Sequence, residues 1–488
     1  MSREALHLPV LPDQPREKCG VLGIWGEPQG AHLAYMGLFA LQHRGQESAG
    51  IAATDGTRIE RSTGMGLVAQ VFDEKCLGDF DALVATRPGQ AAGIIAHNRY
   101  STTGASRSEN AQPFLGHYRG GQVAIGHNGN IVNAKALRQR LEDDGHAFYT
   151  SSDTEVVLSL LAAHSHNGQS DPLGAALSQL QGAFSLVLLF RDRIEVARDP
   201  HGWRPLVLGR TADGHPVAAS ETVALDVIGA EFIREVEPGE IVTLDDTGLH
   251  SRRFAPAAMP AAHCVFEHVY FASPASTLFG LNVQTVRERL GATLAQESPV
   301  EADLVVPMPD SGRSAATGFS RSAGIPYREA IIPNRYVGRT FIKPTGSERA
   351  AAVRLKLNVI ADIVAGQRVV IVDDSIVRGT TTRLKMDQLR AAGAREIHLR
   401  ISCPPIRHPC FFGVDFPDRE QLIAHARNPD EIGALLGVDS LAFLSLEGLL
   451  DVVSQGPVAP ESYCTACYSG KYPISVDGSA QKHALQPR

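Results

Sequence analysis

Two adjacent aspartates and a run of hydroxyl-bearing residues lie in segment 368–382, RVVIVDDSIVRGTTT. Its apolar residues predict a buried strand that ends at Asp373 and Asp374, with a loop and a helix after it. Backbone N–H groups at a helix start, with nearby hydroxyls, hold phosphate, whereas paired carboxylates suit ribose hydroxyls and Mg²⁺. The donors that we expect to contact the phosphate are Ser375, Gly379, Thr380 and Thr381.

This segment resembles the phosphoribosylpyrophosphate (PRPP) signature of the type I phosphoribosyltransferases. The alternative is a generic strand, turn and helix with capping residues; a Walker A loop is excluded because no Gly-Lys-Ser/Thr follows. Upstream, VVPMPDSGRSA ends a predicted strand in a turn where Ser311 is available to Mg²⁺ or pyrophosphate. The two segments together predict a PRPP site with a bound metal ion.

Basic side chains precede the aspartates in NRYVGRTFIKP and RLKLN. Each one alone is consistent with a solvated surface charge, but the group suits pyrophosphate binding and stabilisation of a leaving group. We expect the segment to act as a mobile lid. Its basic residues are Arg335, Arg339, Lys343, Arg354 and Lys356, of which Arg339 and Lys356 are assigned to PRPP.

A second set of motifs occurs in order within residues 19–157: CGVLGIWG, LQHRGQESAGI, AHNRYSTTG, GHNGNIVN and TSSDTEVV. Together they resemble the glutaminase domain of the N-terminal-nucleophile, or class II, amidotransferases. Taken singly, a cysteine before a strand is usually a small buried hydrophobe, and Asn-Gly is usually a hairpin turn. Asp153 alone would be interpreted as a helix N-cap. The ordered set favours the glutaminase interpretation.

Cys19 follows the polar leader MSREALHLPVLPDQPREK. A cysteine at a free N-terminus has its own α-amine as a base, which titrates at about 7.7–8.0 and can take up the thiol proton. The resemblance therefore implies that residues 1–18 are a propeptide, removed by self-catalysed cleavage between Lys18 and Cys19. Loss of the initiator methionine alone would not expose this cysteine.

The resemblance also assigns the other glutaminase residues. Asn128, through its side chain, and Gly129, through its backbone N–H, would form the oxyanion hole for acyl transfer from glutamine. Arg99 would bind the substrate α-carboxylate through its guanidinium group, and Asp153 would pair with the α-ammonium. Holding both ends of the amino acid would select glutamine over other amides.

The remaining cysteines include a Cys464-Thr-Ala-Cys467 pair with the spacing of metal ligands. With Cys264 and Cys410, the pair resembles the iron–sulfur branch of the family, which implies a structural 4Fe–4S cluster without redox turnover. Four thiolates also suit zinc, and free thiols are a further alternative. Cys403 is expected in the core, or else as a ligand in place of Cys410.

These sites require two architectures. Residues 20–250 contain many short apolar runs, such as GVLGIW, AAGIIAH, QVAIGH and FSLVLLF, which predict a strand-rich α+β unit. A helix is predicted over AHLAYMGLFALQ, with Leu33, Met36 and Ala40 on one face. Another is predicted over DTEVVLSLLAAH, capped by Ser152 or Asp153.

Further along, DLVVPMP, RVVIVDD and EIHLRISC alternate with helical segments such as TTRLKMDQLRAAGA, which predicts a parallel sheet with crossover helices. The Ala/Pro-rich segment 254–263 marks a boundary. The resemblance implies an αββα N-terminal-nucleophile domain over 19–255 and an α/β type I phosphoribosyltransferase domain over 264–473. They are flanked by the propeptide, 1–18, and a polar tail, 474–488.

Bulk composition is that of an ordinary globular protein. The chain has 488 residues, 43% hydrophobic and 20% charged, with a net charge of −7, which makes nucleic acid a poor default partner. No apolar run is long enough for a membrane span, and the leader is no secretory signal. The cysteines do not form a disulfide framework, so a cytoplasmic location is expected.

A glutaminase followed by a PRPP site resembles the amidophosphoribosyltransferase family. The resemblance implies that glutamine, PRPP and water give 5-phosphoribosylamine, glutamate and pyrophosphate at the committed step of purine synthesis, with ammonia passing internally. It also implies a homotetramer and feedback inhibition by purine nucleotides. The rivals are a non-enzymatic PRPP-sensing regulator, and a phosphoribosyltransferase with a decayed first domain that uses only ammonia.

Overall fold

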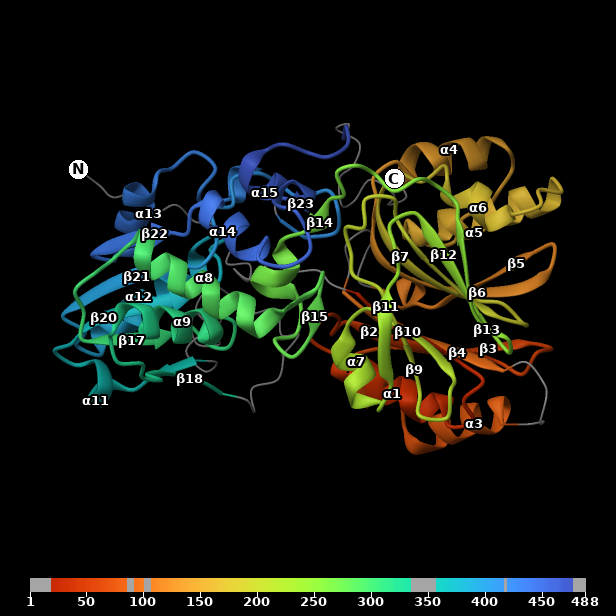
Figure 1. Ribbon diagram of the computed structural model, residues 1–488, viewed down its shortest axis with the longest axis horizontal. Helices are drawn as coiled ribbons and strands as arrows, with labels where there is room; N and C mark the ends of the chain where they lie inside the picture. Colours follow the sequence, from red (N-terminus) through yellow and green to blue (C-terminus); the bar gives the residue numbers. More distant parts are fainter. Residues whose placement is uncertain (1–18, 86–91, 101–106, 335–356, 417–418, 477–488) are drawn as a thin grey trace.

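The structure is a computed structural model of the chain, and it describes residues 19–85, 92–100, 107–334, 357–416 and 419–476. Two bodies lie side by side along the long axis, one built from the first half of the chain and the other from the second (Figure 1). The predicted basic lid residues and the leader lie outside the described residues.

The first half contains a seven-stranded antiparallel sheet in the order β11-β9-β10-β1-β4-β2-β3. The predicted strand GVLGIW forms β1, which lies between β10 and β4 and is buried throughout. The strands of this sheet are β1 (Gly20–Trp25), β2 (Ser48–Thr54), β3 (Ile59–Met65), β4 (Gly93–Arg99), β9 (Val207–Arg210), β10 (Pro216–Ala219) and β11 (Glu231–Glu235).

A six-stranded antiparallel sheet, in the order β13-β12-β8-β7-β6-β5, packs against the first one (Figure 1). The apolar layer between the two sheets joins residues of both, among them Val21 and Ile95 from one and Ala124 and Val187 from the other. The strands are β5 (Phe114–Tyr118), β6 (Gly121–Ile131), β7 (Gly182–Leu189), β8 (Ile194–Arg198), β12 (Glu240–Asp245) and β13 (Gly248–Arg253).

Helices cover the outer face of each sheet, and each covering has an apolar layer of its own. This arrangement confirms the predicted αββα layers (Figure 1). On the seven-stranded sheet lie α1 (Gly30–Ala40), α3 (Glu74–Val84) and α7 (Thr222–Val227), with the short α2 (Val68–Val71) beside β2. On the six-stranded sheet lie α4 (Ala134–Asp143), α5 (Thr154–His166) and α6 (Pro172–Leu177); η1 (Ser108–Asn110) precedes β5.

The helix α1 forms where it was predicted, but the predicted apolar face was wrong. Met36 is 41% exposed, whereas the buried face carries small residues such as Ala31 and Ala34. A methyl group at Gly37 would lie 2.3 Å from Leu22 Cδ1. Small side chains therefore let α1 approach the sheet closely, whereas Met36 and Phe39 are exposed.

The second half contains a four-stranded parallel sheet in the order β17-β20-β21-β22, which confirms the predicted α/β unit. Its strands are β17 (Leu304–Pro307), β20 (Arg368–Asp373), β21 (Glu396–Ile401) and β22 (Ser440–Phe443). The helices are α8 (Val283–Glu297), α9 (Arg313–Ala323), α11 (Ala361–Val364), α12 (Thr380–Ala391), α13 (Pro429–Leu436), α14 (Leu446–Val453) and α15 (Ala466–Ser469).

Short elements join the two bodies and complete the second. The pair β14 (His263–Cys264) and β23 (Tyr463–Cys464) is parallel and joins residues 463–464 to the start of the second half (Figure 1). A π-helical turn, η2 (Glu267–Phe271), follows β14. The other short elements are β15 (Thr277–Leu278), β16 (Leu281–Asn282), β18 (Ile331–Pro333), β19 (Leu357–Val359), η3 (Arg419–Gln421) and η4 (Pro460–Ser462).

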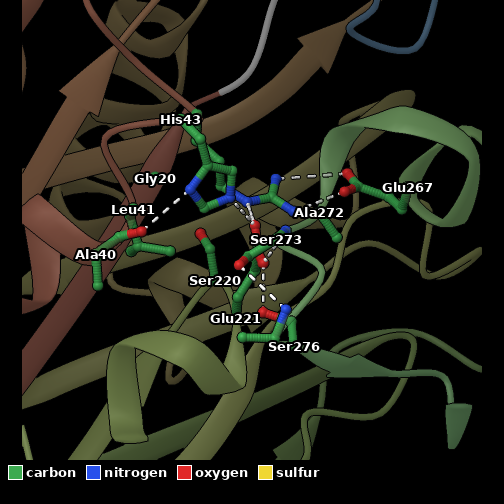
Figure 2. A network of polar contacts seen from close by, with 12 residues as sticks. Gly20, Ala40, Leu41, His43, Ser220, Glu221, Glu267, Ala272, Ser273 and Ser276 are labelled. Carbon is green, nitrogen blue, oxygen red and sulfur yellow. Dashed lines mark hydrogen bonds and ion pairs between the residues drawn. The ribbon is translucent and has the colours of Figure 1, made fainter. Parts of the chain in front are cut away.

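Buried charges hold the junction together. Arg44, from the first half, bonds to Glu221 and donates to Glu267 Oε2 at 2.6 Å. Glu221 also accepts from Ser273 N at 2.8 Å and Ser276 Oγ at 2.5 Å, as Figure 2 shows. These bonds attach residues 273–276, which lead into α8, to the first body. In the part of the chain that the structure describes, no helix has both the length and the apolar character to cross a bilayer.

Candidate active sites

The predicted nucleophile lies at the start of β1. Cys19 is only 5% exposed, and its Sγ lies 3.6 Å from the carbonyl oxygen of Tyr100. The next residue, Gly20, donates its backbone N–H to Asn98 Oδ1 at 2.7 Å. Since Gly20 and Asn98 are register partners in β1 and β4, the thiol is placed beside the end of β4, where Arg99 lies.

The Asn-Gly pair is not a hairpin turn, because Asn128 and Gly129 lie within β6 and pair with β7. A methyl group at Gly129 would lie 2.0 Å from the carbonyl oxygen of Ala183, so only glycine fits there. The side-chain nitrogen of Asn128 is buried and has no hydrogen-bond partner among the described residues. Such a donor suits a substrate oxygen that is absent from the structure.

Arg99 and Asp153, predicted to hold the two ends of glutamine, are both 3% exposed. Burial raises the pKa of Asp153, but His127, the N–H of Ile131 and Arg99 outweigh it and hold the pKa below its usual value. The N–H of Ile131 donates to Asp153 Oδ2 at 2.9 Å. Asp153 precedes α5 without a side-chain cap bond to it, so the N-cap alternative does not account for its carboxylate.

Two histidines that the sequence analysis missed connect these groups. His97, in β4, contacts the carbonyl oxygen of His127 through Nε2 at 3.0 Å, and thereby joins β4 to β6. His127 Nδ1 lies 3.1 Å from Thr154 Oγ1. Burial lowers the pKa of His97 to about 3, so its ring is neutral. The dipeptide His-Asn in both AHNRY and GHNGN was the available signal.

The predicted PRPP loop follows β20 at the carboxyl edge of the parallel sheet. Asp373 and Asp374 are 8% and 4% exposed, and Ser375 Oγ donates to Asp374 Oδ2 at 2.5 Å. Gly379 precedes α12 with φ +78°, and a methyl group there would lie 2.4 Å from Ile423 Cδ1. The hydroxyls of Thr380 and Thr381 therefore stand in the first turn of α12, where a phosphate would bind.

The Ser311 turn lies at the same edge of the sheet. Pro307, at the end of β17, is the register partner of Val372, and Met308 N donates to Val372 O at 2.8 Å. The turn between β17 and α9 is thus next to the aspartates. Arg335, Arg339, Lys343, Arg354 and Lys356 lie outside the described residues.

The four predicted cluster cysteines gather at the junction of the two bodies. Cys264 and Cys464 are register partners in the β14–β23 pair. Burial raises the pKa of Cys264 to about 12 and that of Cys464 to about 11, with Cys410 among the groups that act on each. Burial also raises the pKa of Cys467, on which the other three act.

The surroundings of the four thiols combine a cation with aromatic rings. Arg204 is fully buried, and Cys264 and Cys410 are among the groups that raise its pKa. The indole of Trp203 stacks on Phe412, with ring centroids 4.4 Å apart. Cys403 is fully buried in the core of the second body, with its Sγ 3.3 Å from Pro404 O, as expected of a core residue.

Comparison with known proteins extends these observations. Residues 97–227 match a family described as a glutamine amidotransferase domain. The chain is 46% identical to an amidophosphoribosyltransferase of Bacillus subtilis over 464 residues, 94% of this chain and 95% of the relative. It is also 46% identical to one of Synechococcus elongatus over 480 residues, 97% and 95% of the two chains.

A solved structure agrees with both bodies. The glutamine PRPP amidotransferase of B. subtilis, complexed with ADP and GMP, matches with a TM-score of 0.88 and 44% identity, over 96% of this chain and 100% of that one. The two stacked antiparallel sheets, the parallel sheet and the grouped site residues define a glutamine amidotransferase joined to a phosphoribosyltransferase.

The chain belongs to the amidophosphoribosyltransferase family. These enzymes convert glutamine, PRPP and water into 5-phosphoribosylamine, glutamate and pyrophosphate in purine biosynthesis. Membership removes the non-enzymatic regulator from consideration.

Proposed function

We propose that Cys19 is the nucleophile of the glutaminase half-reaction and that it acts after removal of residues 1–18. The free α-amine would take the thiol proton as Sγ attacks the glutamine amide carbon, and would then deliver it to the departing ammonia. Burial of Cys19 and the short distance from its Sγ to Tyr100 O support this role. Water would then release glutamate from the thioester.

Asn128 and Gly129 would stabilise the oxyanion of that attack. A preorganised pair of N–H donors suits the charge that develops on the amide oxygen, and loss of one donor costs roughly 10²–10³ in kcat. The buried, unpaired Nδ2 of Asn128 is the observation that carries this assignment. Arg99 would bind the α-carboxylate of glutamine, and Asp153, ionised at neutral pH, would bind its α-ammonium.

In the second body, the loop after β20 would bind PRPP. Backbone N–H groups and hydroxyls of Ser375, Gly379, Thr380 and Thr381 would hold the 5-phosphate, and Asp373 and Asp374 the ribose hydroxyls. Arg339 and Lys356 would bind the pyrophosphate. Ammonia would attack C1 as pyrophosphate leaves, which requires positioning and charge stabilisation rather than a covalent intermediate.

Magnesium would be held near Ser311, Asp373 and Asp374. Mg²⁺ usually keeps several waters and binds through one or two carboxylates and substrate phosphates. That fits the buried pair of Asp373 and Asp374. When bound, the ion would neutralise charge on pyrophosphate.

The thiols of Cys264, Cys410, Cys464 and Cys467 would hold a structural 4Fe–4S cluster. The buried Arg204 guanidinium suits the negative charge of a thiolate-bound cluster. The resemblance to the iron–sulfur branch of the family favours the cluster over zinc.

The domain limits and assembly complete the proposal. The glutaminase domain would cover 19–255 and the phosphoribosyltransferase domain 264–473, with a propeptide, 1–18, and a tail, 474–488. Ammonia would pass between the sites inside the protein, because ammonium in water is a poor nucleophile. Purine nucleotides would inhibit, as the ADP and GMP bound to the B. subtilis structure support. We expect a cytoplasmic homotetramer.

The test compares two activities in wild-type protein and Cys19→Ser. The variant should lose glutamine-dependent synthesis by more than about 10³-fold and keep ammonia-dependent synthesis from PRPP. Intact mass of anaerobically purified wild-type protein should show that residues 1–18 are absent. An active protein that keeps its leader, or glutaminase activity with serine at 19, would contradict the proposal.

A further inference from the structure

Segment 411–413 of the second body lies directly against the proposed oxyanion strand of the first. Asn130 Nδ2 donates to the carbonyl oxygen of Phe411 at 2.8 Å. A methyl group at Gly413 would lie 3.3 Å from the carbonyl carbon of Gly129 and 3.4 Å from its Cα. A side chain at position 413 would therefore press on Gly129, so the two backbones lie close together although they are far apart in sequence.

Arg204 fixes the segment from the side of the first body. Its Nη2 donates to Phe412 O at 3.0 Å, and its Nη1 donates to Glu267 Oε1 at 3.0 Å. Glu267 also accepts from Arg44, so this guanidinium belongs to the buried charge network at the junction. Phe412 is buried and stacks on Trp203. A fully buried, paired arginine has little freedom to move.

The other side of the segment is held by the C-terminal region. Arg407 N and His408 N both donate to Cys467 O at 3.0 Å. Tyr472 donates its hydroxyl to Pro409 O at 2.7 Å. Phe412 N lies 3.4 Å from Cys410 Sγ. The segment is therefore a rigid bridge between the cysteine group and β6.

Position matters at Gly129, because an oxyanion donor is useful only within about 0.5 Å of its productive place. Glycine has no side chain of its own to pack, so its backbone depends on its neighbours. β7 pairs with it on one side, where Ala183 O approaches closely. Segment 411–413 accepts a hydrogen bond from the next residue, Asn130, and leaves no room for a side chain between Gly413 and Gly129.

We propose that segment 411–413 is a positioning element of the glutaminase site and acts through Gly129. The inference rests on the proposed oxyanion role of Asn128 and Gly129. It means that a loop of the phosphoribosyltransferase body completes the glutaminase site without touching substrate. Release of this loop would impair glutamine hydrolysis before it impairs use of ammonia.

The principal test is Gly413→Ala, with Gly324→Ala as the matched control. Both glycines have positive φ, +96° and +69°, but a methyl at Gly324 meets nothing within 4 Å, whereas at Gly413 it meets Gly129 and Arg204. Gly413→Ala should lower glutaminase kcat about tenfold or more, with KM for glutamine within about twofold. Ammonia-dependent synthesis and iron content should match wild type. Gly324→Ala should match wild type in glutaminase kcat and KM, in ammonia-dependent synthesis and in iron content.

Asn130→Ala removes the hydrogen bond to segment 411–413 from the side of the first body. Loss of one hydrogen bond should lower glutaminase kcat about fivefold. Combined with Gly413→Ala, the losses should be less than multiplicative, because both variants act on one contact. This variant keeps the test decisive if Gly413→Ala fails to fold.

Two results would overturn the inference. One is wild-type glutaminase kcat in Gly413→Ala and Asn130→Ala; the other is a parallel loss of glutaminase, ammonia-dependent activity and iron, which indicates general damage. Asn128→Ala, measured alongside, separates this from the proposed function. Wild-type kcat in Asn128→Ala would remove the oxyanion assignment itself.

Discussion

Asp153 accepts a backbone hydrogen bond and carries the charge that is proposed to bind substrate. Asp153→Asn keeps an oxygen that can accept from Ile131 N but removes the charge proposed to bind the glutamine α-ammonium. A charged hydrogen bond contributes about 1.5–3 kcal/mol, so KM for glutamine should rise at least about tenfold while kcat changes less. Steady-state glutaminase kinetics measure this. An unchanged KM would place the ammonium elsewhere.

His97 predicts a pH dependence of stability. Its pKa is about 3 in the folded protein and about 6.5 when unfolded, so below pH 6.5 the unfolded state binds a proton that the folded state does not. Stability is therefore lost as pH falls, by about 2 kcal/mol at pH 5 from this one group. Urea unfolding should show that the free energy of unfolding falls less between pH 7 and pH 5 in His97→Gln than in wild type. Equal losses would contradict the prediction.

At the scale of elements, the start of α12 depends on Gly379. Alanine there would be strained at φ +78° and would press on Ile423. Gly379→Ala should lower ammonia-dependent kcat/KM for PRPP at least about tenfold, because the N–H groups at the helix start would shift. Gly366→Ala is the control, since Gly366 has φ +75° and open space around it. An equal fall of kcat/KM in both variants would indicate a general effect of backbone strain and not a role of Gly379 at the helix start.

At the scale of the whole molecule, buried charges hold the two bodies together. Glu267→Ala would leave the buried Arg204 without its carboxylate partner. It would also remove one of the two carboxylates that pair with Arg44. Figure 2 shows Glu267 at one end of this network and Glu221 within it. Breaking a buried pair costs about 3–5 kcal/mol, so the urea midpoint should fall clearly.

Glu60→Ala serves as the comparison, because the Arg58–Glu60 pair is exposed on both sides, 64% and 48%. Such a pair contributes about 0–1 kcal/mol, and its loss should hardly move the midpoint. Equal midpoints for Glu267→Ala and Glu60→Ala would show that the junction network adds little stability.

Local patterns in the sequence determined much of this protein. Apolar runs predicted β1, β17, β20 and β21, because a strand needs only its own residues to be apolar. The Gly379 loop was predicted because an acidic pair, a glycine and a run of hydroxyl residues follow an apolar strand in that order. Motif order placed the candidate nucleophile, oxyanion donors, glutamine-binding residues and cysteines on the chain.

Only the tertiary structure decided which faces and loops meet. Periodicity placed α1 correctly but not its buried face, which depends on how closely the helix packs on Leu22. The network of Arg44, Glu221 and Glu267 joins residues that are distant in sequence, and so does the hydrogen bond from Asn130 to Phe411 beside Gly129. Sequence patterns show that a side chain is apolar or charged, whereas its partner depends on how the sheets, helices and bodies pack.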